Sequence, residues 1–161
     1  MLKTLYFLRH GLAEVREEWS EDDALRPLTS KGKKNLVRSV KTISDLDLGI
    51  DLILTSPLVR AFQTAEIVAD ELGIEKRLVK DDRLEPGFNL ELLSEMLKEH
   101  TDADEVLLVG HEPDFSQTVS ALISGGIVVF KKGGLARVDI TSIDPLQGEL
   151  AWLLPPKLLI R

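Results

Sequence analysis

Short, mainly apolar runs alternate along the chain with longer segments in which apolar residues recur every three or four positions. The clearest apolar runs are Leu2–Leu8, Asp51–Thr55 and Val106–Val109, with a shorter one at Leu78–Val79. A strand that is apolar along its length is buried on both faces, as parallel strands are when helices cover them. The alternation of such strands with helical segments therefore predicts an α/β fold with a sheet between two helical layers.

The helical segments carry recognisable start and stop residues. Thr29 is a suitable N-cap for a helix whose apolar residues continue to Leu46. Ser56 and Pro57 resemble an N-cap followed by a proline at the first helical position, which predicts a helix that runs to about Leu72. Two further helices are predicted at Asn89–Glu99 and Asp114–Ser124.

The last third of the chain contains strand candidates that are joined by short loops. These candidates are Ile127–Phe130, Ala136–Ile140 and Glu149–Leu154. Because the loops between them are too short for a crossover helix, at least one pair is expected to be antiparallel. The polar stretch Glu14–Asp23 is typical of a loop. We therefore expect residues 1–161 to form a single domain, a three-layer α/β/α sandwich with a mixed, mostly parallel sheet.

Composition narrows the class of protein. With 43% hydrophobic and 29% charged residues, the 161-residue chain is typical of a globular protein rather than a disordered one. It has no cysteine, which excludes disulfides, thiolate metal ligands and a cysteine nucleophile. A net charge of −7 argues against a nucleic-acid partner, which would need clustered Lys and Arg. The chain shows no signal-peptide pattern and no apolar run near the roughly 18 residues of a membrane span, so we expect a cytoplasmic protein without a membrane partner.

Three of the predicted strands end in basic side chains. The first is followed by Arg9 and His10, the second leads to Arg60 in a first helical turn, and the third is followed by His111. Because the carboxyl ends of parallel strands meet at one edge of a sheet, these four side chains are expected to converge there. The helix predicted to start at Ser56 would add main-chain N–H donors and the positive end of its dipole.

A phosphoryl group is the ligand that suits this set of side chains best. Arginine offers a planar fork of donors that matches phosphate oxygens, and histidine donates a hydrogen bond or attacks phosphorus when it is neutral. Gly11 allows the chain to leave the strand pleat, so that Arg9 and His10 reach one ligand, and it permits a close approach of its own main chain to the substrate. Each residue alone is more often structural, whereas three matching strand ends favour a site. A metal centre is disfavoured, because the two histidines lack a carboxylate or thiolate partner and the arginines would repel a cation.

Four ordered motifs carry a family resemblance. FLRHG, RPLTSKG, TSPLVRAFQTAEI and VGHEPDFS resemble the motifs of the histidine phosphatase superfamily, which includes the phosphoglycerate mutases. The short chain, the RPLT segment and the VGHEPDFS form are most similar to the SixA-type phosphohistidine phosphatases. The fold that this resemblance implies is the phosphoglycerate-mutase-like α/β/α sandwich.

The resemblance also implies roles for individual residues. His10 would be the nucleophile that becomes transiently phosphorylated, while Arg9, Arg60 and His111 would hold the phosphoryl oxygens. Arg26, from the RPLT segment, would be a further phosphate or substrate contact. No metal or other cofactor is expected. A neutral His10 is required, and a hydrogen bond from its other ring nitrogen to a main-chain carbonyl would fix that tautomer, while the arginines would lower its pKa.

The general acid is the uncertain part of the resemblance. Mutase-like members carry a glutamate that protonates the leaving oxygen, and Glu85 lies near the expected place in a segment that does not match the mutase pattern. A solvated turn carboxylate is at least as good an interpretation of Glu85. Imidazole, whose conjugate acid has a pKa of about 6.5, leaves with a weaker acid or with none, whereas an alkoxide needs one.

Three hypotheses about function therefore remain. The leading one is a phosphatase that removes the phosphoryl group from a phosphohistidine on a protein, which fits a short chain with little room for a lid. The first alternative is a phosphatase of small phosphomonoesters or nucleotides, with Glu85 as its acid. The second is a non-catalytic module that binds phosphoproteins. The retained His10 argues against this last hypothesis, since a binding module needs no nucleophile.

Overall fold

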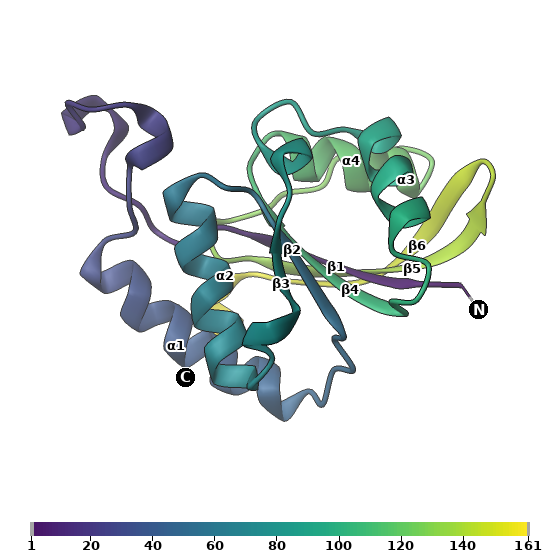
Figure 1. Cartoon of the computed structure of the whole chain (residues 1–161), viewed down its shortest axis with the longest axis horizontal. Coiled ribbons are helices and arrows are strands. Elements are labelled where there is room, and N and C mark those ends of the chain that lie inside the picture. The colour runs from purple at the N-terminus through teal and green to yellow at the C-terminus, as the bar shows by residue number, and fades with distance from the viewer. Residues whose placement is uncertain (1, 161) are drawn as a thin grey trace.

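A six-stranded sheet with strand order β3-β2-β4-β1-β5-β6 forms the centre of the protein, in a computed structural model that describes residues 2–160 (Figure 1). β1 to β4 are mutually parallel where they pair, whereas β5 is antiparallel to both of its neighbours, β1 and β6. The prediction of a mixed, mostly parallel sheet is confirmed. The strands are β1 (Thr4–Arg9), β2 (Leu52–Thr55), β3 (Leu78–Lys80), β4 (Glu105–Gly110), β5 (Leu135–Ile143) and β6 (Leu146–Leu154).

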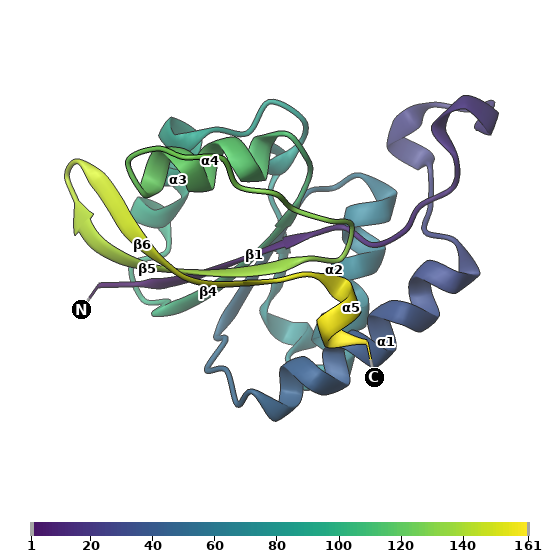
Figure 2. The ribbon, with the colours of Figure 1, turned by 180° about the vertical axis from the view of Figure 1, so that it is seen from behind.

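Helices cover both faces of the sheet, which makes three layers (Figures 1 and 2). The helices are α1 (Ser30–Asp45), α2 (Val59–Leu72), α3 (Leu90–Glu99), α4 (Asp114–Leu122) and α5 (Pro156–Leu159). Successive side chains of a strand point to opposite faces. In β1, Leu5 and Phe7 belong to the core cluster that contains residues of α3 and α4. Tyr6 and Leu8 belong to the cluster that contains residues of α1 and α2. The apolar run at the N-terminus is therefore buried on both sides, as predicted.

Local side-chain chemistry explains where several helices begin and end. Thr29 caps α1, because its Oγ1 accepts the Gly32 N–H at 2.9 Å. Asn89 caps α3 in the same way, with its Oδ1 accepting the Leu92 N–H at 3.0 Å. Gly73 ends α2 in the left-handed conformation, with a φ of 69° that few other residues adopt. The predicted helix boundaries at these residues are confirmed.

The start of α2 differs from the prediction. The helix begins at Val59 with Leu58 as its N-cap, so Ser56 and Pro57 precede it and no side chain caps it. The Ser56 hydroxyl accepts the Leu58 N–H at 3.2 Å and also lies 2.7 Å from a ring nitrogen of His111. This distant partner holds Ser56 in the loop. A helix N-terminus at Ser56 was therefore a wrong prediction, although Arg60 still lies in the first turn of α2.

One further segment differs from the prediction. Ile127–Phe130 is a loop rather than a strand, in which Ile127 is 97% exposed while Phe130 is buried in the core. The polar stretch Glu14–Asp23 contains short 3-10 turns within a segment, residues 12–28, that leaves the body of the protein beyond the end of β1 (Figures 1 and 2). We call residues 12–28 the arm. An isolated antiparallel bridge between Ala13 and Leu28 closes its base.

Among residues 2–160, no helix combines the length and the apolar character that crossing a bilayer requires.

Gly32 provides a test of how the base of the arm is packed. A Cβ at this position would collide with the main-chain oxygen of Leu12. Gly-to-Ala changes inside helices usually stabilise a protein by about 0.5–1 kcal/mol. Here the collision reverses the sign, and we expect Gly32→Ala to lower the free energy of unfolding by about 1–3 kcal/mol in urea denaturation. Lys34→Ala, at an exposed position of the same helix, should change it by less than about 0.5 kcal/mol. A Gly32→Ala protein as stable as the wild type would contradict this packing.

Candidate active site

The hydrogen-bond ladder of the sheet continues one residue past the strands and brings the candidate residues together. Arg9 is paired with Gly110 in the β1–β4 register. Beyond it, the His10 N–H donates to the Gly110 carbonyl at 3.1 Å, and the Ser56 N–H donates to the Val109 carbonyl at 3.0 Å. The chain therefore emerges from β1, β4 and β2 at neighbouring points of one edge, as the parallel arrangement predicts.

His10 is buried, neutral and fixed in one tautomer. His10 is only 6% exposed, and its Nδ1 donates to the Gly11 carbonyl at 2.8 Å. The proton is therefore on Nδ1, and Nε2 keeps its lone pair. Burial is the largest cause that lowers the pKa of His10 to about 3; the charges of His111, Arg60 and Arg9 act in the same direction, and the Gly11 hydrogen bond acts against them. This is the protonation state that a histidine nucleophile needs.

Gly11 contributes to the site differently from the prediction. Its φ lies outside the left-handed region, so the turn after Arg9 does not require a glycine for its conformation. A Cβ at Gly11 would instead lie 2.7 Å from a methyl carbon of Leu36, so the Leu36 side chain would have to move to admit a larger residue. Its N–H donates to Thr64 Oγ1 at 3.1 Å, and its carbonyl is bound by His10. Both polar groups of Gly11 are thus used to hold the site together.

The two arginines share one arrangement of their guanidinium groups. Nη1 of Arg9 donates to the Phe130 carbonyl at 2.8 Å, and Nη1 of Arg60 donates to the Asp23 carbonyl at 2.9 Å. In both, the Nε atom is buried and has no hydrogen-bond partner within residues 2–160. A buried N–H without a partner costs free energy, so such donors indicate a ligand that accepts from them. The Nε–Nη2 edge of a guanidinium matches the spacing of two phosphoryl oxygens.

His111 lies beside His10 and adds a further donor. The two ring centroids are 5.4 Å apart, and His111 is only 3% exposed. Its Nε2 lies 2.7 Å from the Ser56 hydroxyl, which already accepts the Leu58 N–H and so has its own hydrogen free for Nε2. When the Ser56 hydroxyl donates to Nε2, the imidazole proton lies on Nδ1, a buried atom with no partner among the described residues. Burial first, and then the charge of Arg60, lower the pKa of His111 to about 4.

Arg26 reaches the same cluster from the arm. Its Nε donates to Oδ1 of Asp23 at 2.9 Å, and its Nη1 donates to the Glu14 carbonyl at 2.8 Å. Asp23 also forms an ion pair with Arg60, at 3.0 Å. The structure therefore brings together Arg9, His10, Arg60 and His111 at the sheet edge and places Arg26 one ion pair away.

The sequence of this chain matches the family model described as histidine phosphatase superfamily (branch 1) over residues 5–85. The chain belongs to the histidine phosphatase superfamily. It is 35% identical to an uncharacterized protein of Picosynechococcus, over 94% of this chain and 99% of that protein. It is 26% identical to the phosphohistidine phosphatase SixA of Escherichia coli K12, over 94% of this chain and 93% of SixA.

Solved structures agree with this membership. The structure of the protein histidine phosphatase SixA complexed with tungstate superposes with a TM-score of 0.86 at 26% identity, over 97% of this chain and 99% of that one. A mycobacterial glucosyl-3-phosphoglycerate phosphatase, at 15% identity, shares the fold with a TM-score of 0.74 over 94% of this chain and 98% of that one. The family and these likenesses establish a phosphatase with the phosphoglycerate-mutase-like α/β fold.

Glu85 forms no hydrogen bond with the cluster of basic residues at the sheet edge. It is exposed at the end of a 3-10 turn, and its carboxylate forms no hydrogen bond or ion pair with residues 2–160. The loop that follows it is attached to α4, because the Gly87 N–H donates to Oδ2 of Asp114 at 2.8 Å. Glu85 therefore lies on a segment near His111 without a contact that would hold it in the site.

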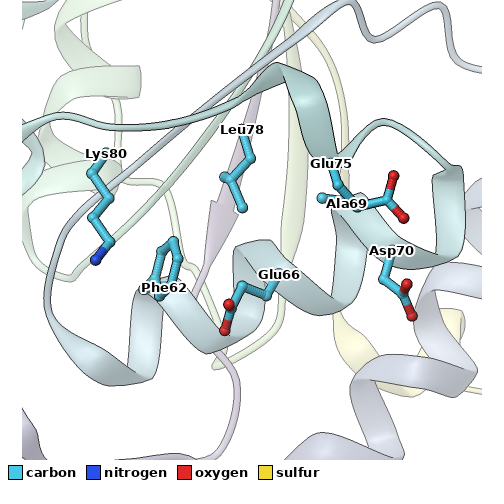
Figure 3. A pocket seen from close by; sticks show the side chains of 7 residues that line it. All are labelled: Phe62, Glu66, Ala69, Asp70, Glu75, Leu78 and Lys80. Carbon is cyan, nitrogen blue, oxygen red and sulfur yellow. The ribbon is translucent and has the colours of Figure 1, made fainter.

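Arg9, Arg60 and His111, which carry the unpaired nitrogens, lie outside the large cavity between α2 and β3 (Figure 3). This cavity, of about 540 Å³, is lined by Glu66, Asp70 and Glu75, and the Nζ of Lys80 lies 4.1 Å from the centre of the Phe62 ring at one end. Three carboxylates make it unsuitable for a phosphorylated ligand. None of the sheet-edge residues lines it. Within residues 2–160, no three His, Asp or Glu side chains are arranged to hold a metal ion.

Three residues that organise the site were missed at the level of sequence. Ser56 was assigned to a helix cap, and Asp23 was counted in a solvated loop. Thr64 was not singled out, although its hydroxyl donates to the Arg60 carbonyl at 2.8 Å and accepts the Gly11 N–H. Ser56 and Thr64 do lie within the motif TSPLVRAFQTAEI, which is the one signal that could have drawn attention to them.

The lowered pKa values of the two site histidines predict an unusual pH dependence. His10 and His111 should both stay neutral from pH 7 down to about pH 5, since their pKa values are about 3 and about 4. In the unfolded chain both titrate near 6.5, so the unfolded state binds more protons below that pH. Stability is therefore expected to fall as the pH drops from about 6.5 towards 4.

Imidazole C2–H chemical shifts measured by NMR between pH 4 and 8 test the first expectation, and urea denaturation at pH 7 and pH 5 tests the second. The pH dependence of stability should be smaller in His10→Asn than in the wild type, because one of the two groups is gone. A titration midpoint near 6.5 for His10 would contradict the described burial of its ring.

Proposed function

We propose that this phosphatase removes the phosphoryl group from a phosphohistidine on a protein, through a phosphorylated His10 and without a metal ion or other cofactor. The observation that carries the proposal is the neutral His10, with Nδ1 bonded to the Gly11 carbonyl, beside two arginines whose buried Nε atoms lack partners. Phosphoryl transfer depends mainly on positioning and on stabilising charge, and these residues supply both.

The proposed reaction has two steps. First, the Nε2 lone pair of His10 forms a bond to phosphorus while the bond from phosphorus to the substrate ring breaks. The substrate ring carries a proton on its other nitrogen, so the electron pair leaves with a neutral imidazole. The Nε edges of Arg9 and Arg60 and the Nδ1–H of His111 bind the three phosphoryl oxygens as their charge is redistributed. Water then attacks the phosphorus, the bond to His10 breaks, and its electron pair returns to Nε2. Inorganic phosphate and the starting enzyme are the products.

The carboxylates near the site support an imidazole leaving group. Burial raises the pKa of Asp23, but the Arg26 hydrogen bond and the charge of Arg60 outweigh it, so that this pKa is lowered and Asp23 is ionised. Both oxygens of Glu112 accept hydrogen bonds from Ser116, at 2.8 and 2.7 Å. Glu85 has no contact that would orient it. A site without a positioned acid suits imidazole far better than an alkoxide. The similarity to SixA proteins supports the same substrate class.

One observation favours a second candidate function, the hydrolysis of small phosphomonoesters or nucleotides with Glu85 as acid. The Gly87–Asp114 hydrogen bond holds the loop after Glu85 next to the start of α4, only three residues beyond His111. A movement of this loop would bring the carboxyl group towards a leaving oxygen.

The proposal is tested by comparing substrates that differ in their leaving group. We expect kcat/KM for a phosphohistidine peptide to exceed that for glycerol phosphate, which releases an alkoxide, by about 10²-fold or more, the typical contribution of a missing acid. Glu85→Gln should leave phosphohistidine turnover within about threefold of the wild type, as should Glu91→Gln, an exposed control on α3. His10→Ala should abolish both turnover and the acid-labile phosphate label on the protein.

Each outcome decides between the hypotheses. A loss of about 10²-fold in phosphomonoester turnover on Glu85→Gln, with Glu91→Gln unaffected, would establish the second candidate instead. Labelling or turnover that persists in His10→Ala would refute the mechanism. Binding of a phosphohistidine peptide without any turnover would leave a non-catalytic binding module.

A further inference from the structure

Among residues 2–160, Asp23 is the one carboxylate that contacts both Arg26 and Arg60. Its Oδ2 accepts from Nη2 of Arg60 at 3.0 Å, and its Oδ1 accepts from Nε of Arg26 at 2.9 Å. Its main-chain carbonyl accepts from Nη1 of Arg60 at 2.9 Å. Because Asp23 lies in a 3-10 turn of the arm and Arg60 lies in α2, these bonds also attach the arm to the body of the protein.

The atoms involved show which part of Arg60 is occupied. A guanidinium is planar and carries five N–H groups, arranged along an Nη1–Nη2 edge and an Nε–Nη2 edge. Asp23 takes the Nη1–Nη2 edge with two acceptors, one from its main chain and one from its side chain. The Nε atom remains buried and without a partner among residues 2–160. A phosphoryl group and Asp23 therefore use different edges of Arg60 and bind at the same time.

Burial explains why Arg60 needs such a partner. The Arg60 side chain is only 5% exposed, and burial lowers its pKa while the charge of Asp23 raises it. A buried charge is stable only when it is paired and hydrogen-bonded, and breaking such a pair leaves the remaining group free to reorient. Arg9 is held in the same way by a neutral carbonyl, that of Phe130. Asp23 thus holds the Arg60 guanidinium by hydrogen bonds, as the Phe130 carbonyl holds that of Arg9, and Asp23 also supplies a negative charge.

We propose that Asp23 is a positioning residue for phosphoryl transfer, which fixes the guanidinium plane of Arg60 so that its Nε edge is presented to the phosphoryl group. The proposal rests on the proposed function only in taking Arg60 as a phosphoryl ligand. A donor that is fixed before the ligand arrives stabilises transition-state charge without reorganisation, so the loss of Asp23 is expected to lower kcat more than it raises KM.

The direction of the effect on anion binding separates this role from a purely electrostatic one. Removing a negative charge near an anion site strengthens anion binding by Coulomb attraction alone. If Asp23 positions Arg60, its removal weakens anion binding instead. When Asp23 is removed, a positioning role therefore predicts weaker anion binding, and a purely electrostatic role predicts stronger anion binding.

The experiment compares Asp23→Ala and Asp23→Asn with Asp22→Asn. Asp22 is exposed and adjacent, and an asparagine there keeps the bond in which Oδ1 accepts the Ala24 N–H at 3.0 Å. Calorimetry gives the affinity for tungstate, and turnover of phosphoimidazole gives kcat and KM. We expect tungstate affinity to fall about 5- to 10-fold and kcat about 10- to 100-fold in Asp23→Ala, with smaller losses in Asp23→Asn, which keeps one acceptor. Asp22→Asn should match the wild type.

A second pair of variants tests whether Asp23 acts through Arg60. In an Arg60→Lys protein, a further Asp23→Asn change should cost little, because the planar edge that Asp23 holds is already absent. An equal fold-loss in both backgrounds would refute the positioning role, as would tighter tungstate binding in Asp23→Asn or Asp23 variants indistinguishable from Asp22→Asn. If the wild type fails to hydrolyse phosphoimidazole while tungstate affinity falls as expected, the proposed function fails and the positioning role stands. Asp23→Asn preserves the main-chain carbonyl and one side-chain acceptor. It therefore still tests the proposal if the Asp23→Ala protein does not fold.

Discussion

The parallel pairing of β1 and β2 with β4 is the constraint on which the site depends. β4 lies between the other two strands, so its last carbonyls accept from both the His10 N–H and the Ser56 N–H. The register of this pairing is secured by the core, because a slip of one residue would exchange the side chains of β1 between the two helical layers. Leu5 and Phe7 would then face α1 and α2 instead of α3 and α4. The packing of ordinary apolar side chains therefore sets the positions of the two site histidines.

Burial then converts this arrangement into a reactive one. Desolvation is the largest cause of the lowered pKa values of His10 and His111, and the arginine charges add to it. The same burial leaves Nε of Arg9, Nε of Arg60 and Nδ1 of His111 without acceptors among residues 2–160. Unsatisfied donors and repelling charges destabilise the fold, and the phosphoryl group of the proposed substrate would offset both. A cost in stability at these residues is typical of functional sites.

The parts of this structure that follow from sequence are those decided locally or by periodicity. The cap at Thr29, the glycine stop at Gly73 and the apolar strands all obey short-range rules, and the basic residues directly after the strands needed only the sheet to bring them together. Ser56 shows where such rules fail, because its hydroxyl bonds His111, 55 positions away, rather than capping a helix. Asp23 stands in a run of acidic residues from which no local pattern distinguishes it, and only its contacts with Arg26 and Arg60 do.

Residues at the sheet edge and residues on the surrounding loops have separate positions in this fold, which is compatible with different leaving groups. A protein histidine phosphatase and a glucosyl-3-phosphoglycerate phosphatase share this architecture, so the fold by itself does not determine the leaving group. In this chain the remaining groups lie outside the sheet, Asp23 and Arg26 on the arm and Glu85 on the loop before α3. The arm is attached to Arg60 through two charged hydrogen bonds to Asp23, whereas the Glu85 carboxylate has no such attachment within residues 2–160. In the function that we propose, fixed donors combined with an unattached Glu85 suit a leaving group that departs without an acid, which is the property of imidazole.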